Sequence, residues 1–362
     1  MTRIKGLLLI FLLGLIPYLS HSQLVAPKYS NEFLSIGVGA RAMGMSNVQV
    51  ANTNDVTAGY WNPAGLLQIK SKYEGALMHS EHFAGIAKYD YGAVGTRLDS
   101  TSVLAVSVIR FGVDDIPDTR FLFGHDGNST TPNYSNVRYF SASDYAFLIS
   151  YAKKDVLIPG LNIGGNVKII HRIVGNFANA WGVGLDAGAQ YVKKGWLLGL
   201  MARDVTGTYT AWSHNTALVK DIYAQTGNEI PQNSVEVTMP RLIGGIGRSH
   251  RFMEQKFGVV GAADFEFTFD GKRNTLIKSD FTSIDPRIGF EADYKQIVFL
   301  RFGAGNVQRV KDWDGKSYTK VQPNFGLGIR IKKVYIDYAL TNIGDFKGSL
   351  YSNVFSLRAE IK

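Results

Sequence analysis

The fold class follows from the stretch LNIGGNVKIIHRI at residues 161–173, in which apolar and polar side chains alternate. Leu161, Ile163 and Val167 hold one parity, whereas Asn166 and Lys168 hold the other. A period of two with one apolar parity indicates a β-strand whose two faces meet different environments. The stretch therefore predicts a strand with one apolar and one polar face.

The same period returns along most of the chain, and several alternating segments run for about ten residues, as a tilted membrane strand requires. Strands of globular proteins more often have about 5–6 residues. About fourteen segments qualify, an even number as single-chain bacterial barrels require. The candidate strands lie near 73–80, 85–97, 102–111, 142–152, 161–173, 180–192, 195–204, 236–248, 256–268, 285–294, 297–306, 322–331, 333–341 and 349–361.

The connections between these segments fall into two classes. Short turns, such as 193–195 and 332–333, alternate with longer polar loops. Membrane barrels are connected in this way, with short periplasmic turns and long outer loops, whereas a β-sandwich has no reason to place every long loop at one end. We therefore predict an all-β fold, a transmembrane antiparallel β-barrel at residues 73–362. The expected outer loops lie at about 112–141, 205–235, 269–284, 307–321 and 342–348.

The composition limits the other classes of protein. The 362 residues include 39 Gly, 21 Phe and 18 Tyr but no Cys, which suits many strands and excludes thiolate chemistry and iron–sulfur clusters. The formal net charge of +9 comes from scattered Lys and Arg without a basic cluster, so no nucleic-acid partner is expected. Beyond residue 22 no apolar run approaches the ~18 residues of a membrane-spanning helix.

Residues 1–22 have the pattern of a signal peptide. Arg3 and Lys5 precede an apolar core at 7–15, and small residues follow at Ser20 and Ser22. The apolar run is too short for a transmembrane anchor, which needs ~20 residues. We expect export and cleavage after Ser22.

Residues 23–72 do not alternate, and they contain two glycine-rich motifs, GARAMGM at 39–45 and WNPAGL at 61–66. A dinucleotide-binding loop is not expected here, because no hydrophobic strand precedes Gly37. In the second motif Pro63 fixes its own φ and Asn62 can bond the neighbouring backbone, which suits a tight turn.

These two motifs, with the stretch 52–58 between them, resemble the N-terminal hatch of FadL-like barrels. More closely, they are similar to the PorV/PorQ family of outer-membrane proteins from type IX secreting bacteria. The resemblance implies a fourteen-stranded barrel with residues 23–72 folded inward as a plug. The residues that match the hatch motif are Gly39, Arg41, Gly44, Trp61, Asn62, Pro63, Ala64 and Gly65.

The resemblance also implies a place and a function. The chain is expected in the outer membrane of a Gram-negative, Bacteroidota-like cell, as a non-enzymatic shuttle or accessory subunit of a large machine. The type IX translocon or attachment complex is the first expectation, and a barrel-assembly complex the lesser one. Its partners would be other outer-membrane complex proteins, secreted cargo, and outer-membrane lipid or lipopolysaccharide.

Apolar residues in the two longest loops are the expected partner contacts, because long loops are often functional and interfaces are rich in aromatic residues. The alternative function is a FadL-like importer of hydrophobic small molecules, which needs an apolar pocket. The strand positions expected to face inward carry Asn, Lys, Arg, Asp and Glu, and we take these polar residues to favour docking to a partner protein. The predicted contact residues are Ile116, Phe121, Phe123, Tyr209 and Trp212.

The sequence predicts no enzyme. A Gly-x-Ser-x-Gly elbow is absent, and His79 and His82 lie too far apart along a strand to converge on one metal. A calcium loop beginning at Asp312 would place Pro323 at its twelfth position, where a carboxylate is needed. We therefore expect no catalytic residues, no metal and no cofactor.

Overall fold

The computed structural model describes residues 24–25, 27–123, 131–156, 158–341 and 352–361. The predicted signal peptide and the loop at 342–348 lie outside these residues. The helical elements are η1 (Glu32–Ser35), α2 (Ala40–Gly44), α3 (Ala58–Trp61), η2 (Pro63–Gln68), η3 (Tyr134–Asn136) and α4 (Thr216–Thr226). The strands are β1 (Leu24–Val25), β2 (Tyr73–His82), β3 (Ala87–Arg97), β4 (Ser102–Asp118), β5 (Arg138–Lys154), β6 (Leu161–Val174), β7 (Ala178–Lys193), β8 (Trp196–Arg203), β9 (Thr208–His214), β10 (Ser234–Thr238), β11 (Arg241–Phe252), β12 (Phe257–Thr268), β13 (Ile277–Lys278), β14 (Ser283–Tyr294), β15 (Val298–Lys311), β16 (Ser317–Ile331), β17 (Val334–Thr341) and β18 (Ser352–Ile361).

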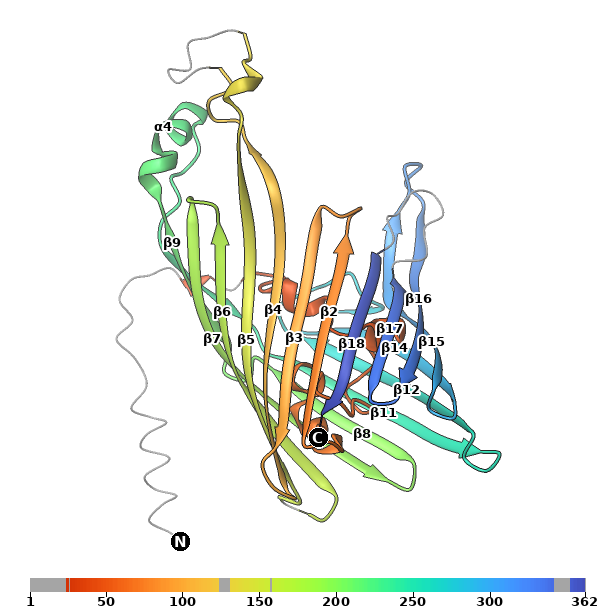
Figure 1. Cartoon of the computed structure of the whole chain (residues 1–362). Helices are drawn as coiled ribbons and strands as arrows, with labels where there is room; N and C mark the ends of the chain where they lie inside the picture. Colours follow the sequence, from red (N-terminus) through yellow and green to blue (C-terminus); the bar gives the residue numbers. More distant parts are fainter. Residues whose placement is uncertain (1–23, 26, 124–130, 157, 342–351, 362) are drawn as a thin grey trace.

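The wall is a closed antiparallel barrel of 14 strands, as predicted (Figure 1). It closes because the last strand, β18, pairs with the first wall strand, β2. Two of the wall strands are interrupted. One consists of β8 and β9, which both pair with β7. The other consists of β10 and β11, which pair with β9 and β8, respectively. The first interruption falls where Asp204 and Gly207 adopt left-handed φ angles of 54° and 76°.

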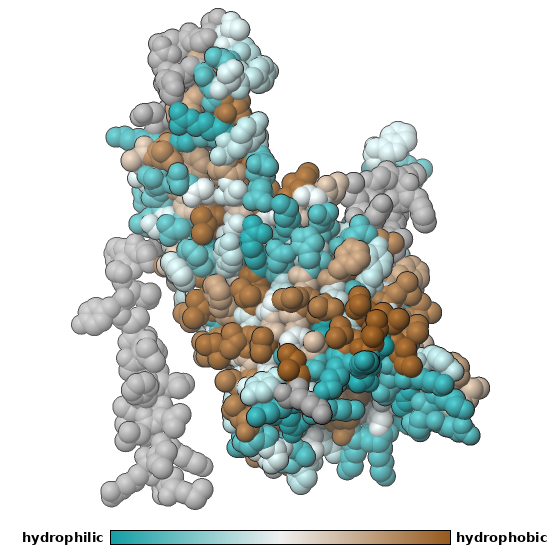
Figure 2. All heavy atoms as spheres, in the orientation of Figure 1, coloured by the Kyte–Doolittle hydropathy of each residue, from teal (hydrophilic) through white to brown (hydrophobic). Residues whose placement is uncertain are grey.

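The alternation in the sequence corresponds to the two faces of the wall. On β12, Phe257, Val259 and Phe265 are exposed to the outside, whereas Asp264 and Glu266 are buried toward the lumen. Figure 2 shows apolar side chains gathered in a belt across the face in view, with polar side chains above and below it. Hydrocarbon requires such a belt, and closure leaves no strand edge unpaired within it.

Four of the predicted long loops are in part regular structure, and the loop at 269–284 contains β13 and the start of β14. The β4–β5 hairpin continues past a bulge between Val113 and Ile116, so that β4 ends at Asp118 and β5 begins at Arg138. The segment 205–235 contains β9, α4 and the start of β10, and β15 and β16 extend into 307–321. In Figure 1 the β4–β5 hairpin rises well above the other strands, with α4 beside it. The loop predictions were wrong there because pairing of these strands continues past the apolar belt.

The segment between β1 and β2 lies inside the barrel, where it forms a hatch with η1, α2, α3 and η2 (Figure 1). Its apolar side chains, among them Val38, Trp61 and Leu66, share a buried core with Tyr89 and Ile109 of the wall. On the opposite wall glycines replace side chains. A Cβ at Gly199 would stand 2.2 Å from the Val50 carbonyl oxygen, closer than real Cβ contacts.

Candidate functional site

The WNPAGL motif fixes the hatch against β6 and β7. Asn62 donates from its side-chain amide to the carbonyls of Val50, 2.8 Å away, and Ala189, 2.9 Å away. Its side-chain oxygen accepts from Ala64 N at 3.3 Å, and Pro63 opens η2 at the position where a missing N–H costs nothing. Gly65 packs against Thr53, where a Cβ would have no room.

The GARAMGM motif lies across the lumen, against β14–β18. Arg41 donates to both carboxylate oxygens of Glu291, at 2.9 and 3.1 Å, and its guanidinium lies 3.7 Å from Asp55. Gly39 precedes α2 with a φ of 86°, and Gly44 meets the backbone of Gly326.

Trp61 joins the two motifs, because its indole N–H donates to Val38 O at 2.9 Å. The structure thus brings all eight predicted hatch residues into one plug, where their contacts are with the chain itself.

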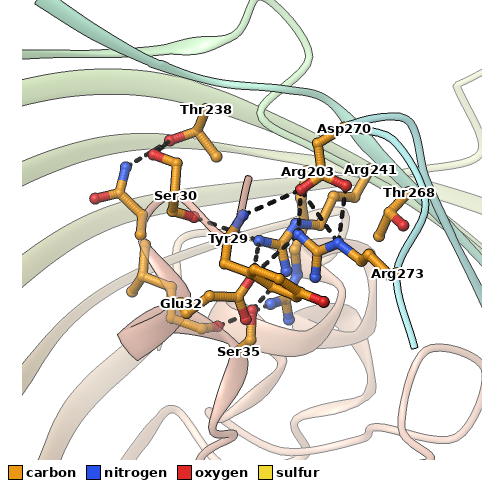
Figure 3. A network of polar contacts seen from close by, with 12 residues as sticks. Tyr29, Ser30, Glu32, Ser35, Arg203, Thr238, Arg241, Thr268, Asp270 and Arg273 are labelled. Atoms are coloured by element: carbon orange, nitrogen blue, oxygen red, sulfur yellow. Dashed lines mark hydrogen bonds and ion pairs between the residues drawn. The ribbon is translucent and has the colours of Figure 1, made fainter. Parts of the chain in front are cut away.

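The first described residues of the hatch form a strap, residues 28–35, at the loop end of the barrel. The side chain of Ser30 bonds Glu236 and Thr238 of β10, and Tyr29 N donates to Asp270 at 3.3 Å (Figure 3). The strap thereby bridges β10 and the connection after β12, and β1 pairs in parallel with β10 just before it.

Arg273 fastens the strap on the β12 side. Its Nε donates to Asp270 at 2.8 Å, and its guanidinium contacts Glu32 of the strap at 3.1 Å (Figure 3). Burial raises the pKa of the Asp270 carboxyl, but the hydrogen bond and charge of Arg273 outweigh it and hold that pKa below its usual range.

A polar cavity of about 420 Å³ opens between the hatch and the loop ends of β11–β17. One wall carries a continuous chain of ion pairs with N–O distances of 2.6 to 3.5 Å. The chain runs through Arg273, Glu32, Arg241, Glu266, Arg287 and Asp285. The neighbouring strands β15 and β16 contribute the neutral amides of Asn306, Gln308, Gln322 and Asn324.

A second pocket, also of about 420 Å³, lies above the barrel between the β4–β5 hairpin and α4. The rings of Phe140 and Phe177 meet edge to face with centroids 5.0 Å apart, and Val219 and Pro231 complete an apolar lining. The guanidinium of Arg120 stacks 4.6 Å from the Phe177 ring centroid. We call this the loop pocket.

Arg120 connects the three segments around the loop pocket. It donates to Asp118 of β4 at 2.9 and 2.7 Å and to the carbonyl of Leu218 in α4 at 2.6 Å. Because its charge is compensated by Asp118, the guanidinium presents its stem and flat face to the pocket rather than an unpaired charge.

The five predicted contact residues do not share one surface. Ile116 is partly buried in the β4–β5 ladder, and Phe121 lies under the guanidinium of Arg138 at 4.8 Å. Phe123 is exposed. Tyr209 and Trp212 are not loop residues, since both belong to β9. Tyr209 faces outward, whereas Trp212 donates to Glu236 at 2.9 Å.

Within the described ranges, no group of three or more His, Cys, Asp or Glu side chains is arranged to hold a metal ion. No helix in the same ranges is long and apolar enough to span a membrane.

The overall geometry is shared with solved structures. A monoaromatic hydrocarbon channel, CymD, superposes with a TM-score of 0.54 at 13% identity, over 90% of this chain and 98% of that one. The chain has the fold of the FadL-type channels. The FadL-type fold is also seen in the Ralstonia pickettii toluene transporter TbuX, with a TM-score of 0.53, 14% identity and coverage of 90% and 99%.

A Pseudomonas aeruginosa FadL homologue likewise has a TM-score of 0.52 at 11% identity, over 89% of this chain and 97% of that one. No family model and no curated protein matches the sequence. At these identities the likeness establishes the fold.

Neither cavity of this molecule was predicted from the sequence. The polar cavity combines residues from the strap with residues more than 200 positions later, so no local motif announces it. The loop pocket could have been suspected from Phe140 and Phe177, which stand near the ends of two neighbouring predicted strands. Their meeting depends on the height of the β4–β5 hairpin, which the loop prediction underestimated.

Proposed function

We propose that this protein is a FadL-type channel that takes up small hydrophobic molecules across the outer membrane, with the loop pocket as their first binding site. The proposal favours the importer over the docking subunit that the inward polar parity suggested. The observation that carries it is the loop pocket itself, in which an apolar patch lies among polar side chains. The patch is formed by Pro117, Phe140, Phe177, Ala178, Val219 and Pro231. The toluene and hydrocarbon channels that share the fold add support.

The lining of the loop pocket suits an aromatic hydrocarbon. Phe140 and Phe177 offer ring faces and edges, and Val219 and Pro231 offer aliphatic surface. Burial of apolar area stabilises a bound hydrocarbon by about 25 cal/mol per Å². An apolar cavity of about 150 Å³ already accepts benzene, so the loop pocket has room for toluene or a larger ring. The charges at its edge, Asp118 and Arg120, are paired with each other and need no partner from the ligand.

Toluene binding by the purified protein tests this proposal. Val219→Arg places a cation in the apolar lining and should weaken toluene binding at least tenfold, about 1.4 kcal/mol. Leu218→Arg is the matched control, because this neighbouring side chain is exposed and does not line the pocket. Toluene binding that is absent in the wild type, or equally weakened by both substitutions, would contradict the proposal.

The docking subunit remains a second candidate for one specific reason. The β4–β5 hairpin, which rises above the barrel, exposes large aromatic rings near its tip, with Tyr134 75% and Tyr139 67% exposed. Together with the PorV/PorQ resemblance of the hatch motifs, this favours a protein partner in a secretion or attachment complex. Tyr134→Ser combined with Tyr139→Ser leaves the lining of the loop pocket in place, so purifying this variant from native membranes separates the candidates. Loss of co-purifying proteins with intact toluene binding supports docking.

A further inference from the structure

The polar cavity at the loop end of the lumen is not explained by uptake of hydrocarbons. It shares no lining residue with the loop pocket, and most of its lining residues carry charged, hydroxyl or amide groups. Its volume of about 420 Å³ lies within the usual range for small-molecule sites. The chemistry of its two walls indicates which ligand it fits.

The charged wall is neutral as a whole. Arg241 bridges Glu32 and Glu266 at 2.7 and 3.5 Å, and Arg287 bridges Glu266 and Asp285 at 2.6 and 2.9 Å. Each guanidinium on this wall therefore already faces two carboxylates. An anionic ligand would have to separate one of these buried pairs, and a cationic ligand would have to displace an arginine. Breaking a buried pair is costly, so the wall disfavours ligands that carry net charge.

The wall formed by β15 and β16, next to β14, offers uncharged hydrogen-bonding groups. Asn306 donates to Gln322 at 2.8 Å and accepts from Gln308 at 2.8 Å, so the amides hold one another in place. The carboxamides of Asn306 and Gln308 each have two donor hydrogens and an oxygen with two lone pairs, and the bonds described here use only part of that capacity.

We infer that the polar cavity binds a small, neutral, hydroxyl-rich solute, of the size of a mono- or disaccharide. Hydroxyl groups both donate and accept, which fits the amides of Asn306 and Gln308. A neutral ligand leaves the chain of ion pairs intact. At the edge of the cavity the half-exposed ring of Tyr29 carries the Arg273 guanidinium, 4.5 Å from its centroid. This site is independent of the proposed hydrocarbon uptake.

Calorimetric titration of the full-length protein tests the inference, in a detergent without a sugar headgroup. Glucose and maltose should bind with a Kd of about 1 mM or tighter. Glucose 6-phosphate and glucosamine, which keep the ring but add a charge, should bind at least tenfold more weakly than glucose. Failure of both neutral sugars to bind, or equal binding of the charged ones, would overturn the inference.

Two substitutions locate the site. Gln308→Leu and Asn324→Leu each remove an amide from the cavity wall and should weaken maltose binding at least tenfold. Thr319→Leu is the control, because Thr319 is exposed on the same β15–β16 hairpin, pairs with Arg309 rather than Gln308, and does not line the cavity.

Toluene binding should be unchanged in all three variants, which shows that they fold and separates this site from the loop pocket. Maltose binding that is weakened as much by Thr319→Leu as by Gln308→Leu would place the sugar elsewhere and refute the inference.

Discussion

Gly199→Ala tests how tightly the hatch fills the barrel. A Cβ at this position of β8 would stand 2.2 Å from the carbonyl oxygen, 2.6 Å from the carbonyl carbon of Val50 and 2.8 Å from the Cα of Ala51. All three are backbone atoms, so no side-chain rotation relieves the contact. Since ordinary contacts begin at 3.4 Å, this part of the hatch must retreat by about 1.2 Å.

Overpacking of this kind costs about 1–3 kcal/mol. The hatch segment around Val50 also holds Asn62 and the carboxylate of Asp264, so its retreat should loosen the plug as a unit. The expected result is a folded barrel with a lower temperature of heat-induced mobility shift on gels. Planar bilayers should also show a measurable conductance that the wild type lacks.

Gly244→Ala is the matched control. Gly244 pairs with Leu200, the residue after Gly199, and a Cβ there would meet no heavy atom within 4 Å in the described part of the chain. Gly→Ala at an unstrained position stabilises by about 0.4–1 kcal/mol through the unfolded state. If Gly199→Ala behaved like Gly244→Ala in both assays, the hatch would not be packed against this wall as described.

Four further predictions follow from other parts of the molecule. Phe265→Arg, in the apolar belt, should destabilise the membrane-inserted barrel by about 2–4 kcal/mol, whereas Phe281→Arg, in an exposed connection, should have little effect. Membrane partitioning of both variants measures this difference. Arg120→Ala should leave the barrel folded but expose the segment around α4 to limited proteolysis, because it removes the bonds to Asp118 and Leu218 O; an unchanged cleavage pattern counts against this role. The chain has no cysteine, so the double variant Ser30→Cys and Thr238→Cys should form one disulfide under oxidation, since the two native hydroxyl oxygens lie 2.7 Å apart. Free thiols in the oxidised protein would contradict the described position of the strap. The pKa of Asp270 in the folded protein lies below the unfolded value of about 3.9. The ion pair of Asp270 with Arg273 therefore stabilises the strap above that pH and is lost only as pH falls through the lower folded pKa. Protease sensitivity of the strap should accordingly be the same at pH 7 and pH 5.

The strands were predictable from sequence because membrane and lumen impose opposite polarity on successive side chains. In β12 this places Phe265 outside and Glu266 inside, and the predicted strand ends lie within a few residues of those observed. The height of the β4–β5 hairpin was not predictable, since above the membrane the outer face need not be apolar and the alternation fades. The division of 205–235 into β9, α4 and β10 was missed for the same reason.

The candidate sites were predictable only where they are local. Asn62 and Pro63 act within one turn, so their spacing revealed them. The ion pair between Glu32 and Arg241 joins residues 209 positions apart, and no pattern in the sequence connects them. Such pairs depend on how the strap meets the wall, which is a property of the closed barrel.

The position of the strap constrains the order in which the molecule can assemble. Residues 28–35 lie at the loop end of the barrel, whereas β2 begins at the opposite end, where Tyr73 pairs with Ile361 of β18. The polypeptide therefore traverses the lumen before it forms β2, the first strand of the wall. A barrel that had already joined β18 to β2 would have to admit this whole segment through an end narrowed by its own side chains. Closure is thus expected to be a late event that traps the threaded segment, and an epitope placed just before residue 28 should emerge on the side of the membrane that bears the long loops.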